Sequence, residues 1–107
     1  MPANPALVDA LLGVTGGYLK VYDIAAPGVY TTGGVVMSAQ QFGLLSLKFL
    51  DGMMTTDGLN FARAIPPSGP GASTITVKWY VASTGAEVAN NSTSMAGKIA
   101  RFLAIGN

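Results

Sequence analysis

Few side chains in this sequence can carry acid–base or metal chemistry. The chain has no histidine and no cysteine. It therefore lacks the commonest general base near neutral pH, the commonest metal ligand and the thiolate nucleophile. Carboxylates remain, and two of them facing one cleft could act as acid and base. The candidates are Asp23, Asp51, Asp57 and Glu87.

Two of these carboxylates stand where aspartate usually serves the backbone. Asp51 precedes Gly52 and Asp57 precedes Gly58, and Asp-Gly pairs favour turns. The stretch DGMMTTDG between them lacks the alternating ligands and the closing glutamate of a calcium loop. Neither Gly-Gly pair of the chain is followed by the Lys-Ser/Thr of a phosphate-binding loop. We therefore predict no catalytic residues, no metal site and no cofactor, and expect the protein not to be an enzyme.

The charge count points to association instead. Charged residues make up 10% of the 107 residues and apolar residues 50%, whereas a typical soluble domain has about 25% charged residues. Little charge repulsion keeps copies apart, which favours a subunit covered by other subunits over a monomer with a small polar surface. The six basic residues are scattered, so direct nucleic-acid binding is not expected. No apolar run approaches the ~18–20 residues of a membrane-spanning helix, and no membrane partner is expected.

Hydrophobic alternation with period two identifies the elements that must position these residues. It is clearest at Thr74–Val81, where every second residue is Ile, Val or Trp. Similar stretches occur at 17–25, 45–49, 59–65 and 99–105, separated by turn signals, and 38–43 fits one capped helical turn. The fold class predicted is all-β: an antiparallel β-sandwich or barrel, jelly-roll-like, with about seven short strands and minor helix. Residues 17–107 would form a single β domain.

The same alternation assigns side chains to faces. Trp79 and Tyr80 point to opposite faces of one strand, so we expect Trp79 in the core and Tyr80 at the surface or an interface, rather than as a sugar-stacking platform. Arg101 shares the face of Ile99, Leu103 and Ile105, so it should reach a partner such as Glu87 or emerge at an interface.

The N-terminal segment, residues 1–16, is predicted to be an arm or a short helix. Pro5 to Leu12 could form two helical turns with Asn4 as the N-cap, or could extend across a neighbouring subunit. The stretch 66–73 is rich in proline and glycine and predicts a surface loop. The expected interface residues are Leu7, Val8, Leu11, Leu12, Pro66, Pro67, Pro70, Tyr80 and Arg101.

Several stretches together resemble small structural proteins of tailed-bacteriophage virions. They are YTTGGVVM followed by FGLLSL, then TVKWYVASTGAEVANNST and the terminal RFLAIGN, within about residues 18–65 and 73–107. The resemblance implies a capsid decoration or cement protein that clamps neighbouring capsomers as a homotrimer. Its partner would be the major capsid protein, on the outer surface of the virion, after assembly in the host cytoplasm. The alternative is a receptor- or carbohydrate-binding module of the virion or tail.

Overall fold

The computed structural model describes residues 6–14, 17–67, 69 and 71–107, with side chains from Gly17 onward, and these residues are mostly strand. The prediction of an all-β, antiparallel fold with minor helix is confirmed. The elements are β1 (Ala6–Val14), β2 (Gly17–Ala25), β3 (Val35–Ser38), the 3-10 helix η1 (Ala39–Phe42), β4 (Leu47–Thr55), β5 (Asn60–Ala64), β6 (Thr74–Val81) and β7 (Ile99–Gly106).

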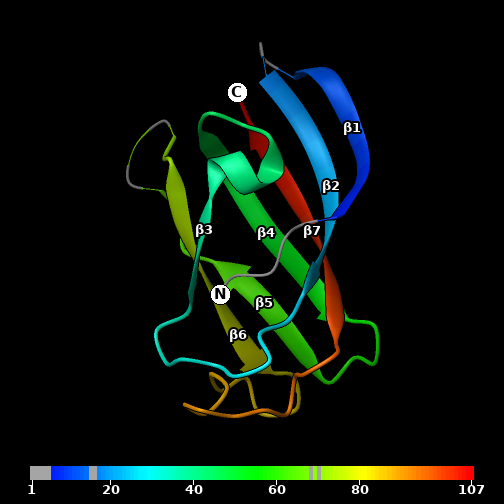
Figure 1. Cartoon of the computed structure of the whole chain (residues 1–107), viewed down its shortest axis with the longest axis vertical. Coiled ribbons are helices and arrows are strands. Elements are labelled where there is room, and N and C mark those ends of the chain that lie inside the picture. The colour runs from blue at the N-terminus through cyan, green and yellow to red at the C-terminus, as the bar shows by residue number, and fades with distance from the viewer. Residues whose placement is uncertain (1–5, 15–16, 68, 70) are drawn as a thin grey trace.

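Within this part of the chain the seven strands form one sheet in the order β1-β2-β7-β4-β5-β6-β3. Neighbouring strands are antiparallel throughout. The sheet curls into a half-barrel, with β1, β2 and β7 on one side, β3 and β6 on the other, and η1 near one end (Figure 1). Strands β1 and β3 are the two edges of this sheet, and β3 is much the shorter.

The core lies inside the curl. Trp79 is 2% exposed and its ring lies 6.0 Å from that of Phe102 on β7, while Tyr22 of β2 meets Phe42 of η1 edge to face at 5.1 Å. The prediction that Trp79 belongs to the core is confirmed. Among the residues with described side chains, no buried side-chain nitrogen or oxygen lacks a hydrogen-bond partner, so the interior is polar only where its polar groups are satisfied.

Small residues lie between the large buried side chains on the inner face of β4, β5 and β7. Ala62 of β5 and Ala100 and Ala104 of β7 are buried, and a Cβ on Gly52 of β4 would lie 2.8 Å from the ring of Phe102. These residues let the strands curl closely around the aromatic rings. The larger apolar side chains that alternate with them therefore lie on the outer face of the sheet.

Residues 6–14 form strand β1, so the helical alternative for this segment is wrong. The strand pairs with β2 from Ala6 opposite Asp23 to Val14 opposite Gly17, with two register irregularities. A helix of eight or nine residues is marginal by itself in water, whereas a hairpin with β2 gives this backbone a hydrogen-bonded partner. Strand β1 is thus part of the same sheet as strands β2 to β7.

Candidate interaction surface on the outer face of the sheet

The side chains that could carry chemistry are engaged in structural contacts. Arg101 of β7 lies opposite Asp23 of β2, and its Nε donates to the Asp23 carboxylate at 2.9 Å. The prediction that Arg101 pairs with Glu87 is wrong. The alternation of β7 turns Arg101 outward, and the register of β2 places Asp23 opposite it. The hydrogen bond and charge of Arg101 lower the pKa of Asp23, and the carboxylate raises the pKa of Arg101.

Glu87 instead serves a buried tyrosine. The hydroxyl of Tyr30 donates to the Glu87 carboxylate at 2.6 Å, and the same carboxylate oxygen accepts the N–H of Gly33 at 2.8 Å. The hydroxyl also accepts the backbone N–H of Trp79 at 3.2 Å. The hydrogen bonds from Tyr30 and Gly33 lower the pKa of Glu87, and burial together with this carboxylate raises the pKa of Tyr30.

The two Asp-Gly pairs have different roles. Asp57 does organise a turn, since its carboxylate accepts the N–H of Leu59 at 3.0 Å and the hydroxyl of Thr55 at 2.7 Å. These bonds, with a smaller contribution from Lys98, lower the pKa of Asp57 to about 2. The turn predicted at Asp51, however, is wrong.

Asp51 lies within strand β4 and forms an ion pair with Arg63 of β5 at 3.0 Å. The following glycine is required by the close approach of the Phe102 ring, not by a turn, because it lacks a left-handed φ. The four carboxylates from residue 17 onward thus each bind a different donor: Arg101, Tyr30, Arg63 or the turn around Leu59. No group of three or more potential metal-ligating side chains is present among the described residues.

What the outer face offers is an apolar surface. Strands β2, β7 and β4 place side chains of this kind next to one another, because their register sets Leu19 opposite Ile105, Val21 opposite Leu103, and Phe49 opposite Ile105. Phe49 is 43% and Met53 65% exposed. We call the following residues the outer apolar patch: Leu19, Val21, Phe49, Met53, Leu103 and Ile105.

Part of this patch is hollowed. A shallow depression of about 420 Å³ is lined by Val21, Phe49, Met53 and Leu103 together with the polar residues Asp51 and Arg101. The two cross-strand ion pairs of Asp23 with Arg101 and of Asp51 with Arg63 therefore lie at its margin. They give the patch both signs of charge and no net charge, which suits contact with a neutral or self-complementary surface.

The predicted interface residues divide into three groups. Arg101 is exposed beside the patch, and Tyr80 lies half-buried on the outer face, where its ring stacks on Phe61 at 5.1 Å. Pro66 and Pro67 line a smaller depression, of about 120 Å³, that also touches Phe49. The third group lies outside the described residues or side chains: Leu7, Val8, Leu11, Leu12 and Pro70.

The outer apolar patch was not predicted from the sequence, although the sequence contains one signal of it. In β7 the charged residue Arg101 shares a face with Leu103, and in β4 Asp51 shares one with Phe49. A charge marks the solvent face of a strand, so the apolar residues beside it are also outside.

No helix among the described residues is long and apolar enough to cross a membrane. Comparison with known protein families, curated proteins and solved structures gives no match.

Proposed function

We propose that this protein is a structural component of a bacteriophage virion, a decoration protein that attaches to the outer surface of the assembled head. The observation that supports this most directly is the outer apolar patch. A sheet face turned to solvent normally carries polar side chains, and a large exposed apolar patch marks a binding surface. The engagement of the described carboxylates in ion pairs and hydrogen bonds also favours a binding role.

In this proposal the patch contacts the major capsid protein or a sister subunit, and copies of the chain associate as a homotrimer that clamps neighbouring capsomers. The scarcity of charge in the sequence supports such crowding, because few charges must be desolvated when subunits meet. The resemblance of the sequence to virion structural proteins supplies the identity of the partner.

Substitution on the patch tests the proposal. Met53→Lys and Leu103→Lys place a charge within the patch without emptying the core, because Met53 is 65% exposed and Leu103 lies on the outer face opposite Val21. Leu45→Lys is the matched control, because Leu45 is 83% exposed and lies on the segment between η1 and β4. Particles assembled with each variant are purified and imaged by electron cryo-microscopy.

We expect extra density on heads made with the unaltered chain and with Leu45→Lys, and bare heads with the two patch variants. Thermal melting of the purified variants shows whether each is folded. Full occupancy of the heads by folded patch variants would refute a role for this face, and absence of the unaltered chain from heads would refute the proposed function.

A receptor- or carbohydrate-binding module is the second candidate, because Phe61 and Tyr80 form an aromatic pair on the outer face. Their rings are stacked at 5.1 Å with an interplanar angle of 13°. Each ring therefore covers one face of the other, which leaves less aromatic surface for a sugar than an open platform provides. Glycan-array binding that disappears in Tyr80→Ala and persists in Met53→Lys would favour this second function.

A further inference from the structure

Among the described residues, β3 pairs with a strand on one side alone, and the backbone groups on its other side face the edge of the sheet. Just beyond the β3–β6 register, the N–H of Ala39 donates to the carbonyl of Ser73 at 2.8 Å. Hydrogen-bonded pairs alternate along an antiparallel ladder, so Met37 and Val35 are the residues of β3 that bond β6. The N–H and C=O of Val36 then point away from β6, toward the edge.

Ser38, the next residue of β3, agrees with this alternation of inward and outward backbone groups. Ser38 should also turn its N–H outward, and that N–H is bonded by the side chain of Gln41 at 2.8 Å rather than by β6. Charged residues and prolines usually prevent another strand from adding to the edge of a sheet. The sequence of β3, VVMS, contains neither. The side chain of Val36 is 55% exposed.

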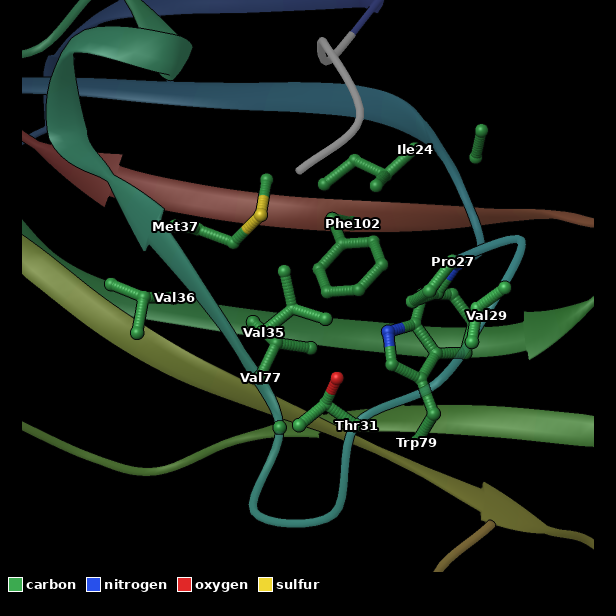
Figure 2. A pocket seen from close by; sticks show the side chains of 12 residues that line it. Ile24, Pro27, Val29, Thr31, Val35, Val36, Met37, Val77, Trp79 and Phe102 are labelled. Carbon is green, nitrogen blue, oxygen red and sulfur yellow. The ribbon is translucent and has the colours of Figure 1, made fainter. Parts of the chain in front are cut away.

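An apolar groove of about 260 Å³ runs beside this open edge. Its opposite wall comes from β2 and the loop after it, and its floor from the core residues Trp79 and Phe102 (Figure 2). Val29, at the rim, is 59% exposed. None of the residues lining the groove is charged.

We propose that this groove accepts an extended, uncharged peptide segment of a partner protein, which adds to β3 as an antiparallel strand. The outward N–H and C=O of Val36 can pair with the backbone of an added strand, and the uncharged walls favour apolar side chains. Because Ile24 and Ala25 of β2 line the far side of the groove, a strand added to β3 would lie between two walls, which favours a single extended segment over the sheet of a second copy.

The register of such a strand fixes its pattern. Directly paired residues of an antiparallel ladder point to the same face, so the residue opposite Val36 points outward with the Val36 side chain. Its two neighbours lie opposite Val35 and Met37, whose side chains face the groove and the core. The segment therefore has two apolar residues flanking one residue of free choice.

The test uses the acetylated and amidated peptide Gly-Thr-Leu-Thr-Leu-Thr-Gly and the full chain labelled with nitrogen-15. We expect saturable shifts of the Val36 amide resonance. Methylation of the nitrogen of the central threonine should weaken binding about five- to tenfold, the equivalent of one hydrogen bond. Binding of similar strength by the methylated peptide, or an unmoved Val36 resonance at millimolar peptide, would overturn the proposal.

Variants of the chain separate the edge from the groove. Val36→Pro removes only an outward N–H, which an edge strand tolerates, and Val29→Lys places a charge on the rim. Both should weaken peptide binding, while Leu59→Lys, at a residue of similar exposure (61%) at another site, should not. Equal binding by all three variants would contradict the assignment.

Two other occupants are distinguished by the same spectra. A Val36 resonance that moves with protein concentration in the absence of peptide would assign the edge to a second copy. Peptide binding that occurs only in a chain lacking residues 1–5 would assign the groove to the protein's own N-terminal end. Either outcome would overturn the proposal of a partner segment.

Discussion

Replacing Tyr30 with phenylalanine would remove one oxygen atom that three segments of the chain share. Tyr30 is fully buried, and its hydroxyl joins the loop before β3 to Glu87 and to the backbone N–H of Trp79 in β6. Without it, that N–H is left buried and unsatisfied, which costs about 1–3 kcal/mol. The free energy of unfolding of a domain this size is only about 5–15 kcal/mol, so the loss should be a measurable fraction of it.

Urea unfolding at pH 7, followed by the fluorescence of Trp79, measures this loss. Tyr80→Phe is the control, because it makes the same chemical change on the half-exposed outer face, where water can hydrate the hydroxyl. A loss below about 0.5 kcal/mol for Tyr30→Phe, the usual range of surface substitutions, would refute the reasoning.

The pH dependence gives a second check on the same variant. The hydrogen bond from Tyr30 is the main cause of the lowered pKa of Glu87, whose ordinary value is 4.5. A lowered folded pKa contributes stability above the ordinary value, and this contribution disappears as the pH falls through the folded pKa. The difference in stability between the unaltered chain and Tyr30→Phe should therefore be smaller in acid than at pH 7.

Three further predictions address the core and the turns. Trp79→Ala should cost about 3–5 kcal/mol, as large-to-small aromatic changes do, in guanidinium unfolding followed by circular dichroism. Gly52→Ala should lower stability by about 1–3 kcal/mol through overpacking against Phe102, whereas Gly28→Ala, with nothing within 4 Å of the new Cβ, should leave the melting temperature unchanged or slightly raised. The unaltered chain should lose stability as the pH falls from about 3.8 through about 2, the ordinary and folded pKa values of Asp57, and Asp57→Asn should flatten this slope in urea titrations.

Much of the strand content could be predicted because alternation is a local property. Thr74–Val81 is strand β6 over the whole predicted range, and the Asp57 turn follows from its own four residues. Residues 6–14 could not be placed in the same way. Their sequence suits a short helix, and only pairing with β2, which a local pattern does not contain, selects the strand.

Which face of β7 lies in the core could not be predicted from the sequence, for a related reason. In β7 both faces are apolar, one with Ala100, Phe102 and Ala104, the other with Leu103 and its neighbours, so hydrophobicity alone cannot choose between them. The curl of the sheet decides, because a tight inner face needs small residues between aromatic rings.

Strand β4 adds a second difficulty, since its phase changes along its length. The register with β7 shifts between Leu47 and Phe49, so Leu47 is buried while Phe49 points outward. Such a bulge depends on the partner strand, and the spacing of apolar residues predicted one continuous face instead. The curl of the sheet and the register shift between β4 and β7 both depend on partner strands. For this reason the spacing of apolar residues alone did not predict the candidate surface.

The composition of the outer face explains how it could provide both affinity and orientation. Covering its apolar side chains would return about 25 cal/mol for each Å² removed from water, and a stable contact covers about 800 Å² on each partner. The ion pairs of Asp23 with Arg101 and of Asp51 with Arg63 lie at the margin of the patch and are exposed. Such pairs contribute only about 0–1 kcal/mol to the stability of the fold. Their arginines can therefore turn to a partner's carboxylates at little cost to the fold. In the proposed attachment, the centre of the patch would supply the binding energy and its charged margin would set the register.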